Sequence, residues 1–154
     1  TGHLVVSTLH TNNSTEAITR LLDMGVEPFL ISSSVNGVLA QRLVKTICPK
    51  CKVDSPMTKD QMDMMGLTEE EVGGQEIQYG TGCDVCGGTG FKSLRGIFEM
   101  LQMDDEVREL IATNTPALML RQKCIEAGMQ TLRMDGLKNM FGGVSTFEEV
   151  MKYS

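Results

Sequence analysis

The sequence predicts an α/β fold with a metal-binding insertion and a C-terminal helical subdomain, and three observations support this. An apolar run, Leu4–Leu9, is followed by an amphipathic helical pattern; four cysteines fall in two Cys-x-x-Cys pairs; and the apolar residues after position 102 recur with helical spacing. We therefore divide the chain into an α/β part at 1–47, a cysteine-bearing element at 48–101 and a helical subdomain at 102–154.

Residues 1–47 follow the order strand, helix, helix, strand, which is typical of the edge of an α/β domain. The apolar run Leu4–Leu9 predicts a short buried strand, and Asn13 is a favourable N-cap for the next helix. Pro28 suits the first turn of a second, short helix. Residues 38–47 then predict a strand that runs directly into the first cysteine pair.

The two cysteine pairs, Cys48 with Cys51 and Cys83 with Cys86, have the spacing of metal ligands. Each pair can offer two thiolates, and four thiolates fill the tetrahedral shell of a structural zinc ion. A filled shell leaves no position for a substrate, so the pattern says little about catalysis. Disulfides or a dithiol redox pair remain alternatives. Because the chain opens on a strand pattern and not on an export signal, we expect reduced thiols.

The rest of the cysteine-bearing element contains further expected pieces. Residues 58–67 predict a small helix, 68–74 a loop rich in Gly and Glu, and 75–80 and 96–103 two strands. The glycines at 87–90 allow tight backbone approach, and their N–H groups can hydrogen-bond to metal-bound sulfur.

The C-terminal subdomain is predicted to be entirely helical. Asp104 or Asp105 would open the first helix, and Thr115–Pro116 supplies a cap and a proline for the next. Ser145 and Glu148 have the spacing of a capping box for the last helix.

Composition excludes several classes of protein. The formal charge of −6 argues against a nucleic-acid binder that works through a broad basic face. No run approaches the roughly 20 apolar residues of a membrane span. The hydrophobic share of 41% is enough for a modest core, and twelve methionines indicate that this core is soft.

Two histidines stand at the ends of the predicted first strand. His3 and His10 are an odd number of residues apart, so on a strand they would face opposite sides and could not share one metal. His10, with Thr8 nearby, would lie at the carboxyl end of a buried strand before a helix N-terminus, where α/β sheets bind ligands and phosphates. A polar turn without a ligand is the alternative.

Three further polar residues are candidates for contacts. Gln41 and Arg42 interrupt an apolar strand, where a structural salt bridge and a subunit or nucleotide contact are both possible roles. Arg20 is either a solvated charge or an intersubunit contact. The sequence contains no GxxxxGK[ST] phosphate loop, so we do not expect this stretch to hydrolyse a nucleotide alone.

Several longer runs resemble one family. "TGHLVVSTLHTN" is similar to the histidine box of the type II secretion / type IV pilus assembly ATPases (the GspE/PilB family), and "RLLDMGVEPFLISSS" and "VLAQRLVKTICPKC" are similar to the segments that come after that box in the family. The two Cys-x-x-Cys pairs resemble the tetracysteine zinc element of that family, and "GIFEMLQM" resembles its continuation. The likeness covers essentially all 154 residues.

The resemblance implies a fold and a context. Residues 1–47 would be the C-terminal edge of a RecA-like P-loop ATPase domain, 48–101 the zinc element and 102–154 the helical subdomain. The parent protein would be a homo-hexamer that uses ATP and Mg²⁺. It would lie in the cytoplasm at the inner-membrane face, held there by secretion or pilus platform proteins, and it would not bind nucleic acid.

The resemblance also implies roles for particular residues. His10 and His3 would be catalytic, with His10 nearer the γ-phosphate or attacking water. The zinc ligands would be Cys48, Cys51, Cys83 and Cys86, and the residues near the nucleotide or the subunit interface would be Thr8, Arg20, Gln41 and Arg42.

Two functions are consistent with these expectations. In the first, the chain is the C-terminal fragment of a motor that couples ATP hydrolysis to pseudopilus or pilus assembly and protein export, and it is inactive alone. In the second, it is an autonomous zinc-stabilised module that docks a protein partner without catalysis.

Overall fold

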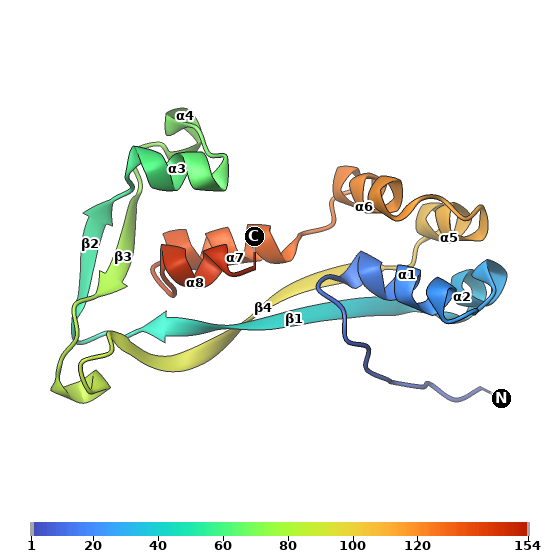
Figure 1. Cartoon of the computed structure of the whole chain (residues 1–154), viewed down its shortest axis with the longest axis horizontal. Coiled ribbons are helices and arrows are strands. Elements are labelled where there is room, and N and C mark those ends of the chain that lie inside the picture. The colour runs from blue at the N-terminus through green and yellow to red at the C-terminus, as the bar shows by residue number, and fades with distance from the viewer. Residues whose placement is uncertain (1, 154) are drawn as a thin grey trace. The chain divides into compact units, whose positions relative to one another are not determined.

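The computed structural model describes residues 2–153, which form two compact units (Figure 1). Unit 1 contains the residues up to Ala40 together with Glu99–Gln130, and unit 2 contains Gln41–Phe98 together with the residues from Thr131 on. The predicted division into 1–47, 48–101 and 102–154 stays a prediction, because contact units say nothing about which segments fold independently.

The elements follow one another as α1 (Ser14–Asp23), α2 (Pro28–Ser34), β1 (Gly37–Ile47), β2 (Lys52–Pro56), α3 (Lys59–Met65), α4 (Glu69–Val72), β3 (Glu76–Gly80), the 3₁₀ turn η1 (Asp84–Cys86), β4 (Phe91–Gln102), α5 (Asp105–Ala112), α6 (Ala117–Glu126), α7 (Leu132–Phe141) and α8 (Phe147–Met151). Across residues 2–153, every helix is too short or too polar to cross a bilayer.

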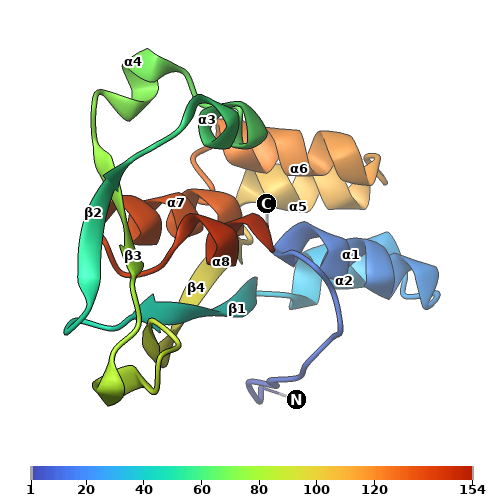
Figure 2. The same ribbon diagram turned by 60° about the vertical axis from the view of Figure 1, so that its left-hand side comes forward.

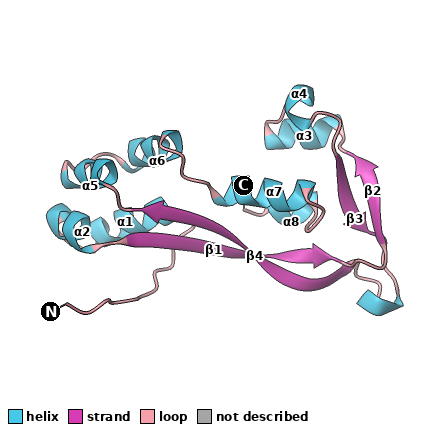
Figure 3. Cartoon of the chain, turned by 180° about the vertical axis from the view of Figure 1, so that it is seen from behind, coloured by secondary structure: helices cyan, strands magenta, loops and turns pink. Residues whose placement is uncertain are grey.

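The segment before α1 differs from the prediction. Residues 2–11 have no regular secondary structure (Figure 3), and Leu4, Val5 and Val6 are 78%, 82% and 86% exposed. The predicted buried strand Leu4–Leu9 is therefore wrong for this structure. A strand needs a neighbour for its backbone groups, and within residues 2–153 the sheets pair only β1 with β4 and β2 with β3. Thr1, where the histidine-box run begins, lies outside the described residues.

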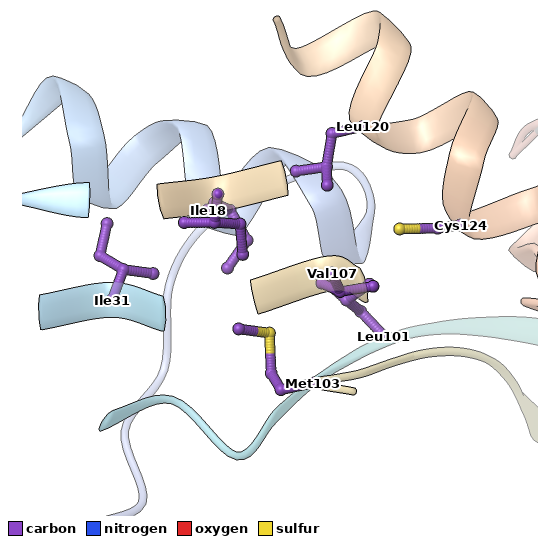
Figure 4. Packing of buried hydrophobic residues seen from close by; sticks show 8 residues of the cluster. Ile18, Ile31, Leu101, Met103, Val107, Leu120 and Cys124 are labelled. Atoms are coloured by element: carbon purple, nitrogen blue, oxygen red, sulfur yellow. The ribbon is translucent and has the colours of Figure 1, made fainter. Parts of the chain in front are cut away.

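Unit 1 is a set of short helices around an aliphatic core. Helix α1 begins as predicted, because the Asn13 side chain accepts the Glu16 N–H at 2.9 Å. Helix α2 packs against α5, and α1 packs against α6. Side chains from all four helices converge on one cluster with the end of β4 (Figure 4). The buried members of this cluster are Ile18, Ile31, Leu101, Met103, Val107, Ile111, Leu120 and Cys124.

Strands β1 and β4 pair with each other, and each contributes residues to both units. They run in opposite directions, because Thr46 hydrogen-bonds to Ser93 while Gly37 lies against the carbonyl of Leu101. Strand β4 begins at Phe91, well before the predicted strand at 96–103.

Unit 2 combines a second hairpin-like pair with helices. Strands β2 and β3 are antiparallel, from Lys52 opposite Gly80 to Pro56 opposite Glu76, and α3 and α4 lie in the connection between them (Figure 2). Strand β2 was not predicted. The predicted loop at 68–74 contains α4, because Thr68 and Glu71 form a capping box that the sequence analysis overlooked.

The helix starts in the C-terminal region partly match the prediction. Asp104 caps α5 as expected by accepting the Val107 N–H at 2.9 Å. Pro116 stands at the N-cap of α6, not at its first helical position, and no side chain caps that helix. The cap of α8 is Thr146, one residue later than predicted, since Ser145 is buried and donates its hydroxyl to the Lys45 carbonyl.

Candidate metal centre and neighbouring polar sites

Backbone hydrogen bonds hold the two cysteine pairs against each other in unit 2. The Cys48 N–H donates to the Gly90 carbonyl at 2.9 Å, and the Thr81 N–H donates to the Cys51 carbonyl at 3.0 Å. Each pair is thus bonded to the chain that flanks the other pair. Thiols that lie far apart in sequence are brought together before any metal is considered.

Glycine is required where the chain that enters the second cysteine pair crosses the chain that leaves it. A Cβ on Gly80 would lie 2.2 Å from the carbonyl oxygen of Gly90, and a Cβ on Gly90 would lie 2.5 Å from the carbonyl oxygen of Gly80. Gly90 also has a φ of +75°, a conformation that side chains disfavour. The close approach that closes the loop carrying Cys83 and Cys86 therefore depends on both residues.

The four sulfur atoms have the separations of a tetrahedral thiolate site. All lie within 4.8 Å of one another. The Cys48–Cys83 and Cys51–Cys86 Sγ atoms are 3.9 Å apart, and the Cys83–Cys86 Sγ atoms are 3.7 Å apart. Zn–S bonds of about 2.3 Å in a tetrahedron place the sulfurs about 3.8 Å apart. The cysteines are free thiols, so the predicted metal set is supported over disulfides.

The pKa values of two thiols in the cluster, Cys51 and Cys86, are shifted in opposite directions. Burial of the Cys51 thiol raises its pKa to about 11. Burial acts in the same direction on Cys86, but N–H groups of Cys83 and Gly90 donate to its sulfur at 3.2 and 3.3 Å and lower its pKa to about 6. The predicted glycine-to-sulfur hydrogen bond is therefore present, and it stabilises a thiolate.

Lysines near the site are held by groups other than sulfur. Lys92 donates to the carbonyl of Val85 at 3.0 Å, and Val85 lies in the turn between Cys83 and Cys86. Lys52 donates to the Gly143 carbonyl at 2.6 Å, and the Lys45 ammonium lies 5.4 Å from the centre of the Phe91 ring. Lys92 and Lys52 therefore hydrogen-bond to loop carbonyls, and all three lysines lie close in sequence to a cysteine or to Gly90.

The residues predicted to face a nucleotide belong to an open part of unit 1. His3, Thr8 and His10 are exposed in the extended segment before α1. The N-terminus of α1 beside them is occupied by carboxylates: the Ser14 N–H donates to Glu99 at 2.9 Å, and the Asn12 N–H donates to Glu16 at 2.9 Å. A phosphate contact by His10 would therefore use its side chain rather than free helix amides.

The other predicted contact residues are divided between the units. Arg20 is exposed on α1, in unit 1. Gln41 is exposed and Arg42 half-buried on β1, in unit 2, where Arg42 donates to the carbonyl of Gln41 at 3.1 Å. Their predicted roles stay predictions.

Sequence analysis missed a buried ion pair in unit 1. Glu99 on β4 is 0% exposed, and its two carboxylate oxygens accept from the guanidinium of Arg121 on α6 at 3.0 and 3.1 Å. The sequence did contain a sign of this pair. Glu99 stands between Ile97 and Leu101 at the alternating positions of a strand that face the core, so a charged side chain there needs a buried partner.

The chain is similar to known proteins over almost its whole length. A family profile described as "Type II/IV secretion system protein" matches residues 1–152. The chain is 46% identical over 151 residues to a "Type IV pilus assembly ATPase PilB" of Thermus thermophilus, covering 98% of this chain and 17% of that protein. It is 46% identical over 153 residues to a "Type II secretion system ATPase E" of Vibrio cholerae, covering 99% of this chain and 30% of that protein. The chain thus spans less than a third of these relatives.

Proposed function

Because the chain belongs to the type II/IV secretion system protein family, we propose that it is the C-terminal region of a longer motor that couples ATP hydrolysis to pseudopilus or pilus assembly. The observation that carries this proposal is the 46% identity, over 99% of the chain, to a relative named as a type II secretion system ATPase. The longer protein would be a RecA-like hexamer that supplies its phosphate loop and Mg²⁺ site from elsewhere in its sequence.

The tetracysteine cluster would hold structural Zn²⁺ through Cys48, Cys51, Cys83 and Cys86. Four sulfur donors at tetrahedral separations suit zinc and leave no coordination position for a water or substrate. The metal would therefore stabilise the loops of unit 2 and take no part in hydrolysis. Four thiolates and one divalent ion together carry a net negative charge, which the lysines around the loops would offset.

The extended segment would be the part of this region that meets the nucleotide. His10 would contact the γ-phosphate or the attacking water through its exposed imidazole, with His3 and Thr8 contributing from the same segment and Arg20, Gln41 and Arg42 from the subunit or nucleotide interface. Platform proteins at the cytoplasmic face of the inner membrane would receive the motion, and nucleic acid would play no part.

ATPase assays on this chain and on the longer protein test the proposal. We expect no hydrolysis by the chain alone and hydrolysis by the longer protein. His10→Ala in the longer protein should lower kcat more than it changes nucleotide affinity, since a transition-state contact is lost. An active chain would show that a separate phosphate loop is unnecessary. Hydrolysis absent from both would favour the alternative, a zinc-stabilised docking module.

A further inference from the structure

A buried polar network in unit 1 fastens the start of α1 to two other elements. The Oε1 atom of Glu99 accepts the Ser14 N–H at 2.9 Å, the Ser14 hydroxyl at 2.6 Å and the Arg121 guanidinium at 3.0 Å. Arg121 also donates to the Thr15 hydroxyl at 3.3 Å. Ser14, Thr15 and Glu99 are 0%, 3% and 0% exposed, whereas the Arg121 side chain is 28% exposed, so the network is buried except on its arginine side.

The residues just before the network are tied to α1 as well. The Asn12 N–H donates to the Glu16 carboxylate at 2.9 Å, and the Thr11 hydroxyl donates to the Asn13 carbonyl at 3.1 Å. The turn at 11–13 is therefore bonded to α1, and the first turn of α1 is bonded to Glu99. His10 is the residue next to this turn, whereas residues 2–10 have no regular secondary structure of their own.

We propose that Glu99 and Arg121 are positioning residues for His10 in the hydrolytic step. Together they fix the N-terminus of α1, and through the turn at 11–13 they fix where the extended segment begins. This inference rests on the proposed function, because it assigns to the network the placement of a side chain that would face the nucleotide. Neither Glu99 nor Arg121 touches the nucleotide in this proposal.

The chemistry of the network suits this role better than a general stabilising one. A buried carboxylate that accepts a backbone N–H at a helix N-terminus fixes the position of that backbone in direction as well as distance. A buried ion pair is by itself weak evidence for stability, since packed apolar residues can serve as well. What an apolar replacement cannot supply is the acceptor for the Ser14 N–H.

Unit 2 offers a matched control. Glu149 is also buried, at 5% exposed, and it accepts the Lys45 N–H at 2.9 Å and pairs with Lys152. Glu149→Leu removes both oxygens that accept from a backbone N–H and from a cation, as Glu99→Leu does, whereas glutamine would keep an acceptor oxygen at either position. The difference is that Glu149 lies in the other unit, where its carboxylate accepts from Lys45 and Lys152.

The first experiment is amide hydrogen exchange on this chain, which measures whether the network holds the turn. Glu99→Leu should accelerate exchange at Asn12 and Ser14 by at least 10-fold, while Glu149→Leu should accelerate Lys45 and leave those two amides unchanged. Arg121→Lys, which keeps the charge but loses the forked donor, should give an intermediate acceleration. Unchanged exchange at Ser14 in a folded Glu99→Leu chain would overturn the proposal.

The second experiment is steady-state ATP hydrolysis by the longer protein that carries this region. Glu99→Leu should lower kcat roughly 10- to 100-fold with little change in KM, because a displacement of about 1 Å can cost 100-fold in rate. Glu149→Leu should leave both near wild type, and Arg121→Lys should lower kcat by less than Glu99→Leu does.

The outcomes separate this inference from the proposed function. If His10→Ala lowers kcat but a folded Glu99→Leu protein does not, the positioning role is wrong and the proposed function stands. If His10→Ala leaves kcat unchanged, the proposed role of the extended segment fails and the positioning role fails with it. If Glu99→Leu raises KM and leaves kcat intact, the network supports nucleotide binding rather than the hydrolytic step, and the inference is overturned.

Discussion

Unit 1 and unit 2 bury apolar side chains in different ways. The core of unit 1 is mostly branched aliphatic, with Ile18, Ile31, Leu101 and Val107 meeting between four helices. The core of unit 2 contains Met57, Met65 and Met140, which adapt to irregular spaces but specify packing less strictly. Unit 2 also contains the cluster of four thiols, whereas the described part of unit 1 has a single buried thiol, Cys124, and no such cluster.

The difference indicates where each unit obtains its stability. Unit 1 can close by helix packing alone, because its apolar residues recur at helical spacing on elements that lie against one another. In unit 2, residues 81–90 around the second cysteine pair are rich in glycine and include one large apolar side chain, Val85, which is exposed. Metal binding to a site of four thiolates contributes folding free energy directly, so the fold of unit 2 should be coupled to metal binding in a way that the fold of unit 1 is not.

The largest expected effect is that of metal removal. A chelator should unfold unit 2 and leave most of the helices of unit 1 intact, because zinc binding to thiolate sites contributes about 10 kcal/mol or more of folding free energy. Amide exchange should rise across β2, β3 and α3, including residues paired across the Lys52–Gly80 register, and stay slow across α1 and α5. Unchanged exchange after metal loss, proven by mass spectrometry, would remove the distinction between the units.

Truncation of a buried core side chain should have the second largest effect, and this effect should differ between the two units. Leu101→Ala should lower the free energy of unfolding of unit 1 by about 2–5 kcal/mol, with or without metal. Met140→Ala, at a residue that is 0% exposed in unit 2, should cost a similar amount and also weaken metal binding, since folding and binding are linked there. Denaturant titration and zinc competition measure the two effects. Equal zinc affinity in both variants would contradict the linkage.

The glycine crossing at the thiols gives a smaller effect. Gly90→Ala should cost about 1–3 kcal/mol in unit 2, because its Cβ would collide with the Gly80 carbonyl and its φ is positive. Gly87→Ala is the matched control, since Gly87 has a φ of +62° but nothing within 4 Å of its Cβ. The difference in unfolding free energy between the two variants measures the collision alone. Equal losses of unfolding free energy in the two variants would show that the chain at Gly80 and Gly90 can move apart at little cost.

Local signals predicted much of the fold. The cap at Asn13, the proline at the start of α2 and the cysteine spacing each depend on a few neighbouring residues, and the structure confirms all three. The site of four thiols could be predicted because spacing alone encodes it. The strand expected at Leu4–Leu9 could not be decided locally, since a strand depends on a neighbour and none of the described strands pairs with it.

Sequence analysis also missed the polar contacts between residues far apart in the sequence. The carboxylate of Glu99 meets Ser14 across 85 positions of sequence, and nothing near either residue indicates the other. The same limit explains the error at α8, where Ser145 would be an acceptable cap by spacing. Its hydroxyl bonds to Lys45 instead, a partner 100 residues away, so Thr146 takes the cap.

The smallest effect concerns the pH dependence of unit 2. Burial acts to raise the pKa of Glu149, but hydrogen bonds from Lys152 and from the Lys45 N–H outweigh it and hold that pKa below its usual value of about 4.3. A carboxyl whose pKa is lowered by folding stabilises the native state above its unfolded pKa, and this contribution is lost as pH falls through the folded pKa.

Glu149→Gln should therefore destabilise unit 2 on the order of 1 kcal/mol near neutral pH and by progressively less below about pH 4.3. The value is modest because Lys152 is half exposed and its charge is screened by solvent. Acid also releases metal from thiolates, but it does so in both proteins, so the quantity to compare is the difference in unfolding free energy between wild type and variant at each pH. A difference that stays constant from pH 7 to pH 3 would show that the charge of Glu149 contributes nothing to the stability of unit 2.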